Sequence, residues 1–132
     1  MQEPTFLILA ALAAQPRHGY GIVQAVAELS ADEVKLKPGT LYGALERLTE
    51  QGLIEVDREE AVEGRLRRYY RLTVDGTGAL TAEIARLDRR ASAARSELRQ
   101  RPGFAFHGLS SRLGLRGEAG LSSRLGLRGG AA

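Results

Sequence analysis

The chain has 132 residues, a hydrophobic content of 43% and no cysteine, which leaves room for one domain plus an appendage and excludes disulfides, thiolate metal sites and cysteine nucleophiles. Its longest apolar run, residues 6–14, is too short to span a bilayer, and no basic residue precedes it as in a signal peptide, so we expect a cytoplasmic protein without a membrane segment. The net charge of +3 divides into −3 over residues 1–75 and +6 over residues 76–132. The overall charge therefore does not indicate nucleic-acid binding, and only the positions of individual cations can do so.

Two helices are predicted in the first thirty residues. The first covers about 4–14, because Pro4 suits a first helical turn and Phe6, Leu9, Leu12 and Ala13 follow at helical spacing. A connector rich in turn formers, "QPRHGYG", leads to a second helix over about 18–29. Its expected buried stripe consists of Ile22, Ala25, Val26 and Leu29.

A third helix is predicted over about 38–51. Pro38 suits its first position, and one apolar face is formed by Leu41, Leu45 and Leu48. Gly52 matches a left-handed cap that ends the helix, with Leu53 as the apolar residue after it.

A β-hairpin follows, with strands at about 53–59 and 65–73 and the polar segment "EAVEG" between them. Alternation in the second strand places Tyr70 on the face that leads to the core and Tyr69 on the other. The sequence leaves two roles for Tyr69, a contact with DNA or a contact within a dimer. Among the arginines of this strand, Arg71 is expected to pair with an acid such as Asp57.

A long last helix is predicted over about 74–100, with Thr73 or Asp75 as its cap and Pro102 after its end. Its apolar positions recur at intervals of four and three, which is a heptad seam. The alternative is packing onto the rest of its own domain, but the short helices cannot cover the whole stripe. The seam therefore predicts a homodimer interface at Leu80, Ile84, Leu87, Ala91, Ala94 and Leu98.

The segment "GLSSRLGLRG" occurs twice, at 108–117 and 120–129, in a Gly/Ser/Arg/Leu composition that predicts disorder. Its arginines, Arg112, Arg116, Arg124 and Arg128, either only solubilise the tail or contact DNA without specificity. We expect a winged-helix domain over 1–73, a dimerisation helix over 74–101 and a low-complexity tail over 102–132. The expected fold is mainly α with a small β-hairpin, a winged helix-turn-helix followed by a long helix.

Three blocks, "HGYGI" (18–22), "GTLYGALERLTEQGLIE" (39–55) and "GRLRRYYRLTVDG" (64–76), make residues 5–100 resemble the PadR family of transcriptional regulators. The resemblance implies a winged-helix homodimer, usually a repressor of a near-palindromic operator. Some members respond to phenolic acids or planar hydrophobic drugs, so it also implies a small hydrophobic or phenolic effector. No cofactor or metal is expected.

The outer face of the third helix carries small and polar residues at its N-terminal end, and Lys37 is a poor cap for that end. Small residues let the N–H groups of a helix end approach a phosphate, although a merely solvated face is the plain alternative. With the resemblance, the sequence predicts DNA contacts from Lys37, Gly39, Thr40, Tyr42, Gly43 and Arg47, and from Arg65, Arg67 and Arg68 of the hairpin.

A winged-helix protein-interaction module without specific DNA binding remains the alternative function, since residues 1–75 are acidic overall. An enzyme is not expected, because no Ser-His-acid order and no Gly-rich nucleotide loop is found. For His18 we expect a role at the helix start or in packing, with Tyr20 against the third helix, and not a metal site.

Overall fold

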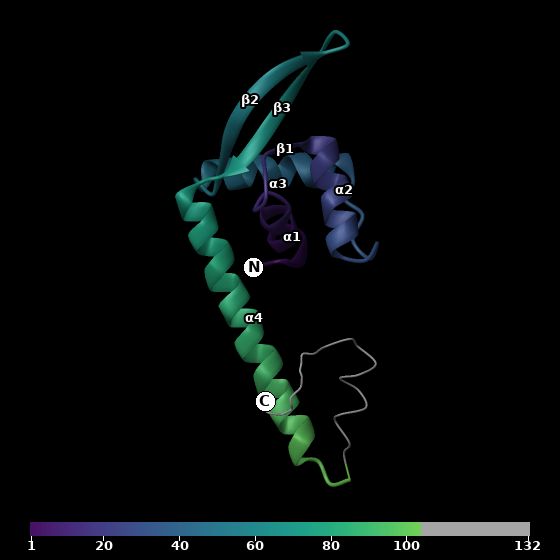
Figure 1. The fold of residues 1–132 in the computed structure, drawn as a ribbon, viewed down its shortest axis with the longest axis vertical. Helices are drawn as coiled ribbons and strands as arrows, with labels where there is room; N and C mark the ends of the chain where they lie inside the picture. The colour runs from purple at the N-terminus through teal and green to yellow at the C-terminus, as the bar shows by residue number, and fades with distance from the viewer. Residues whose placement is uncertain (104–132) are drawn as a thin grey trace. The chain divides into compact units, whose positions relative to one another are not determined.

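The computed structural model describes residues 1–103, in which four helices and a three-stranded antiparallel sheet are found (Figure 1). The elements are α1 (Glu3–Ala11), β1 (Arg17–His18), α2 (Gly19–Leu29), α3 (Pro38–Glu50), β2 (Ile54–Val62), β3 (Arg65–Leu72) and α4 (Val74–Gln100). This confirms the predicted fold class, including the long last helix. The two "GLSSRLGLRG" segments, for which we predicted disorder, and their arginines lie outside the described residues.

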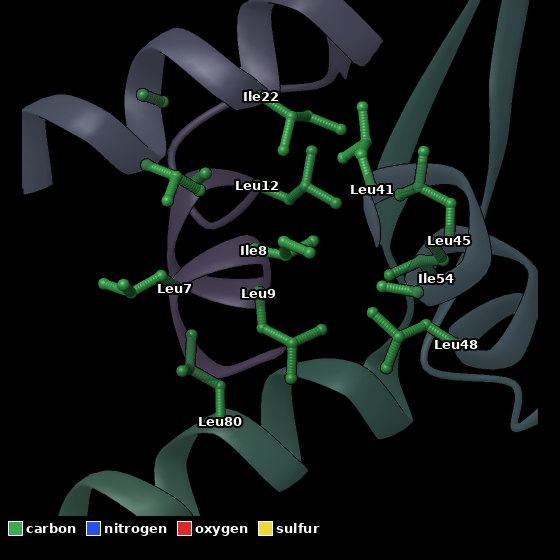
Figure 2. Close-up of a cluster of buried hydrophobic side chains, with 14 residues drawn as sticks. Leu7, Ile8, Leu9, Leu12, Ile22, Leu41, Leu45, Leu48, Ile54 and Leu80 are labelled. Atoms are coloured by element: carbon green, nitrogen blue, oxygen red, sulfur yellow. The ribbon is translucent and has the colours of Figure 1, made fainter. Parts of the chain in front are cut away.

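The chain divides into two compact units, Met1–Leu87 and the part that starts at Asp88. The core of the first unit is built around α1, whose Ile8 and Leu9, with Leu12 directly after the helix, lie between the other helices (Figure 2). Ile22 from α2 approaches from one side, and α3 and the start of β2 supply Leu41, Leu45, Leu48 and Ile54. Burial of these aliphatic side chains is the main source of stability, and it fixes the orientation of α3.

The ends of α3 are as predicted. Pro38 occupies the first turn, and Gly52 after the helix has φ +76. The Leu53 N–H donates to the Leu48 carbonyl oxygen at 3.0 Å, which closes the left-handed cap. This cap turns the chain directly into β2, so α3 and the hairpin are held in a fixed relation.

Three expectations for the first helices were wrong. α1 ends at Ala11 instead of about residue 14, and the chain then forms the short strand β1, which was not expected. Two residues are too few to show a periodicity, and β1 exists because its backbone pairs with Tyr70 and Tyr69 of β3. Leu29, the last residue of α2, is 55% exposed because the helix ends beyond the edge of the core.

The hairpin is longer than predicted, because β2 continues through most of the segment expected to be a loop. Only Glu63 and Gly64 form the turn, and both have positive φ, 52° and 78°. A two-residue turn of this kind matches the twist of antiparallel strands. The register shifts between Val56 and Arg58, which leaves Asp57 as the extra residue of a β-bulge.

The start of α4 is capped by Thr73, whose Oγ1 accepts a hydrogen bond from the Gly76 N–H at 3.0 Å. The same hydroxyl donates to the Gly52 carbonyl oxygen at 2.6 Å, which connects the cap of α4 to the end of α3. Within residues 1–103, no helix combines the length and hydropathy needed to cross a bilayer.

Candidate nucleic-acid interface

The N-terminal end of α3 carries exposed backbone donors. Lys37 precedes the helix and makes no side-chain capping bond, and Pro38 has no N–H. The first bond back to the cap position joins the Leu41 N–H to the Lys37 carbonyl oxygen at 2.9 Å, so the N–H groups of Gly39 and Thr40 precede the intrahelical ladder. These N–H groups lie at the positive end of the helix dipole, and the cap residue Lys37 is a cation, so this end of the helix favours an anion.

The outer face of α3 is exposed and carries little side-chain bulk at its glycines. A Cβ built on Gly39 or on Gly43 would meet nothing within 4 Å in the described part of the chain outside its own helix backbone, so packing there does not require either glycine. Each glycine in a helix nevertheless lowers stability relative to alanine. The two glycines therefore leave this part of the face without side-chain bulk.

Tyr42 is the large side chain of this face and is 57% exposed. Its hydroxyl oxygen lies 2.9 Å from the position that a Cβ on Gly19 would occupy. The glycine at the start of α2 thus allows the phenol ring to lie against that helix with its outer side open. Tyr20 is itself 66% exposed, so the expected packing of Tyr20 against α3 was wrong.

Arg47 lies on the C-terminal half of α3 and is directed toward α1, where its Nη2 donates to the Thr5 Oγ1 at 3.3 Å. It lines a shallow groove of about 470 Å³ with Met1, Gln2, Thr5, Leu48, Gln51 and Leu53. Arg47 is thus on the exposed side of the helix, with its guanidinium held beside α1 and away from the helix tip.

The hairpin, which we call the wing (Ile54–Leu72), carries most of its carboxylates on β2 and most of its arginines on β3. Five of each are present, so the wing has no net charge. Arg68 Nε donates to Glu59 Oε2 at 2.8 Å, and Arg71 Nε donates to Glu55 Oε2 at 2.9 Å. Arg71 also bonds to Asp57 at 3.1 Å, which confirms the predicted pair.

Arg58 is paired as well, with Glu60 Oε2 at 2.8 Å and Asp57 Oδ2 at 2.9 Å. In the part of the chain that the structure describes, Arg65 and Arg67 are the wing arginines that have no carboxylate within 4 Å. They lie on the same face of β3, because their positions differ by two. Arg68 is on the opposite face.

Tyr69 connects the wing to the helical part of the domain. Its ring makes an edge contact with His18, with centroids 5.2 Å apart, and the Arg58 guanidinium lies 3.9 Å from its centroid on the wing side. His18 occupies the cap position of α2 but makes no side-chain capping bond, so of the two expected roles the structure bears out packing, through the contact with Tyr69. Burial lowers the pKa of His18, and the nearby Arg67 charge lowers it further, with Glu60 partly opposing them.

The sequence could not show this stack. The Arg58–Tyr69 contact depends on the bulge at Asp57, and the His18–Tyr69 contact depends on β1. Among residues 1–103, no three His, Cys, Asp or Glu side chains come together in a way that could hold a metal ion.

The predicted apolar seam of α4 divides into two parts. Leu80 is 7% exposed and packs in the core of its own chain, so for this residue the alternative of packing onto its own domain holds. Ile84 and Leu87 are 45% and 40% exposed. Ala91 and Ala94 are exposed and Leu98 is half-buried.

Comparisons with known proteins agree on one family. The family model described as "Transcriptional regulator PadR-like family" matches residues 8–82. The chain is 42% identical over 71 residues to the transcriptional regulator Rv3488 of Mycobacterium tuberculosis, an alignment that covers 54% of this chain and 63% of Rv3488. This chain thus matches less than two thirds of that relative's length.

Two solved structures are similar in fold. A PadR family transcription regulator from Clostridium difficile is 26% identical, with a TM-score of 0.63 over 74% of this chain and 99% of that chain. The structure of Bacillus subtilis PadR in complex with operator DNA is 24% identical, with a TM-score of 0.57 over 63% of this chain and 47% of that one.

Proposed function

The chain belongs to the PadR-like family of transcriptional regulators, and on this premise we propose that it is a sequence-specific DNA-binding repressor that acts as a homodimer on a near-palindromic operator. Membership in a family of regulators also confirms the expectation that the chain is not an enzyme. We place its action in the cytoplasm, where bacterial operators are accessible.

The observation that carries the proposal is the tip of α3. The backbone donors of Gly39 and Thr40 follow the cap residue Lys37 there, and Gly39 and Gly43 face open space on the helix that carries the exposed Tyr42. A phosphate satisfies the donors, and the glycines let the helix approach the duplex closely. Thr40 and Tyr42 then face base edges or sugar in the major groove, which is where sequence can be distinguished. Arg47, held near α1, contacts a flanking phosphate.

The wing contributes a second contact through Arg65 and Arg67, which have no carboxylate partner in the described residues. They are placed near the turn of a long hairpin, where they reach a phosphate or the minor groove. Arg68 was predicted to contact DNA too. In this proposal its contribution is secondary, because Glu59 already binds its guanidinium.

The dimer rests on the exposed part of α4. Ile84 and Leu87 expose apolar surface, and the helix continues through Ala91, Ala94 and Leu98 at heptad spacing. A second copy of α4 can cover these side chains, and the small alanines allow the two helices to approach closely. A dimer also places two α3 tips so that they can enter successive major grooves, about 34 Å apart.

We further propose that a small hydrophobic or phenolic effector enters between the two α4 helices and lowers DNA affinity by changing the distance between the α3 tips. A ligand shifts such an equilibrium only through different affinities for the two arrangements. The effector is therefore expected to bind the free dimer more tightly than the DNA-bound dimer.

Selection of bound fragments from the host genome tests the function directly. The expected result is a near-palindromic motif with half-sites one helical turn apart, bound by a dimer. Competition against a random duplex of the same length then measures specificity. Equal affinity for the selected and random duplexes would exclude a sequence-specific regulator.

The neutral wing and the acidic balance of residues 1–75 favour one alternative, a winged-helix module that binds a protein. The double variant Arg65→Ala, Arg67→Ala distinguishes the two functions in vivo. Loss of regulation supports DNA binding, whereas unchanged regulation with normal protein levels supports the protein-binding module.

A further inference from the structure

The wing pairs three glutamates of β2 with three arginines of β3 in direct register: Glu55 with Arg71, Glu59 with Arg68, and Glu60 with Arg67. Directly opposed side chains on an antiparallel pair lie close together, so each of these pairs is placed to form an ion pair. Two of them do, at 2.9 Å and 2.8 Å. The third pair, Glu60 and Arg67, does not.

The reason lies two residues earlier on β2. Glu60 accepts its hydrogen bond from Arg58 Nε at 2.8 Å instead of from Arg67. Arg58 is also fixed from two other sides, by Asp57 at 2.9 Å and by the ring of Tyr69 at 3.9 Å. This bond from Arg58 is the main reason why the pKa of Glu60 lies below its usual value, with a smaller contribution from the Arg67 charge.

The bulge at Asp57 makes this arrangement possible. In a regular strand Arg58 would share the face of Ile54 and Val56, which leads to the core. The register shift between Val56 and Arg58 places Arg58 opposite Tyr69, on the same face as Glu60 and Arg67. A cation is thereby introduced between the carboxylates of that face, and it binds the glutamate that Arg67 would otherwise bind.

We propose that Arg58 is a positioning residue for DNA binding: by holding Glu60, it leaves Arg67 free for a phosphate. Arg58 itself stays bound to Asp57, Glu60 and Tyr69 in the complex. The inference rests on the proposed function, since it needs a duplex as the partner of Arg67. It gives the β-bulge a role in selecting which arginines of a neutral wing are available.

The test is the salt dependence of binding for Arg58→Gln, Arg67→Gln, Glu60→Gln and the double variant Arg58→Gln, Glu60→Gln, with a genomic duplex from the fragment selection. In the Arg58→Gln variant, Glu60 is released to Arg67. The log–log salt slope is therefore expected to fall by about one unit, as in Arg67→Gln. When residue 60 is glutamine, Arg58→Gln is expected to leave the slope unchanged.

Arg71→Gln is the matched control, because it removes the same charge from the same strand pair and Arg71 is paired with two carboxylates. Its slope should equal that of the wild type. Thermal unfolding of every variant shows whether the wing remains folded, and a crystal structure of Arg58→Gln should show Glu60 bound to Arg67.

Two results would overturn the inference. If Arg58→Gln lowers the salt slope equally with the wild-type Glu60 and with Glu60→Gln, Arg58 is itself a direct DNA contact. If Arg58→Gln lowers the slope in neither protein, Arg58 does not affect the availability of Arg67. If the wild-type protein prefers no duplex, the proposed function fails instead. The two failures are therefore distinguishable.

Discussion

Gly76 in the first turn of α4 lies against the Leu53 carbonyl so closely that a Cβ at residue 76 would stand 1.9 Å from the oxygen. A change of side-chain rotamer cannot relieve this overlap, because the atom that the Cβ meets is a backbone oxygen. The contact fixes the start of α4 against the chain that leaves the C-terminal end of α3, which is the opposite end from the tip proposed to read DNA.

Gly76→Ala is therefore expected to lower the free energy of unfolding by more than about 2 kcal/mol, as overpacking against backbone does. Gly78→Ala is the control, since a Cβ there meets nothing within 4 Å. It should raise stability by about 0.5–1 kcal/mol. Urea titration followed by circular dichroism measures both, and equal stability of the two variants would show that the overlap relaxes.

Gly43→Ala separates fold from function. It should raise the free energy of unfolding by about 0.5–1 kcal/mol, because the added Cβ meets only open space and alanine favours a helix. Affinity for the operator should nevertheless fall about tenfold, since the methyl group intrudes on a closely fitting surface. Gly78→Ala gives a matched gain in stability on another helix and should leave affinity unchanged. Unchanged affinity of Gly43→Ala would remove the argument for a close approach.

The wing arginines should differ in their contribution to salt dependence. Arg65→Ala and Arg67→Ala are each expected to lower the log–log salt slope by about one unit, because each removes one phosphate contact. Arg68→Ala should change it less, since Glu59 already binds that guanidinium at 2.8 Å. Fluorescence anisotropy between about 50 and 200 mM salt measures the slopes. A larger loss from Arg68→Ala than from the other two would place the contact on the opposite face of the wing.

The sequence predicted the elements whose physical signal is local. Helical spacing marked Leu41, Leu45 and Leu48 as a buried face, and Gly52 and Thr73 marked the end of one helix and the start of another. In each case the cause lies within a few residues of the position that it determines.

What the sequence did not predict depends on pairing between distant segments. β1 forms only because β3 offers its second edge, and the bulge at Asp57 moves Arg58 to the other face of β2. Alternation alone assigns Arg58 to the wrong face. That register decides whether each wing arginine has a carboxylate partner. In the described chain, three of the five arginines are paired with a carboxylate and two are not.

The two parts of the α4 seam should respond differently to dilution. Leu80→Ala removes a core side chain and should lower the free energy of unfolding by about 2–5 kcal/mol at every protein concentration. The double variant Ile84→Gln, Leu87→Gln changes exposed positions, so it should weaken the dimer and leave the folded monomer nearly unchanged. Sedimentation velocity over a range of concentrations distinguishes the two. An Ile84→Gln, Leu87→Gln protein that remains fully dimeric would place the interface elsewhere.

The contact between His18 and Tyr69 predicts a dependence of stability on pH. Burial, with the Arg67 charge, holds the pKa of His18 below its ordinary value of about 6.5. Below that pH the unfolded chain binds a proton that the folded chain does not, so the contribution of His18 to stability is complete above about pH 6.5 and is lost as the pH falls toward its folded pKa.

His18→Phe retains an aromatic edge for Tyr69 and cannot titrate. When the pH is lowered from 7.5 to 5.5, the midpoint temperature of thermal unfolding should therefore fall further for the wild type than for the variant. Other titrating groups, including His107, are present in both proteins and cancel in the comparison. Parallel losses in the two proteins would mean that His18 accepts its proton in the folded state as easily as in the unfolded one, and that its packing against Tyr69 does not depend on the neutral ring.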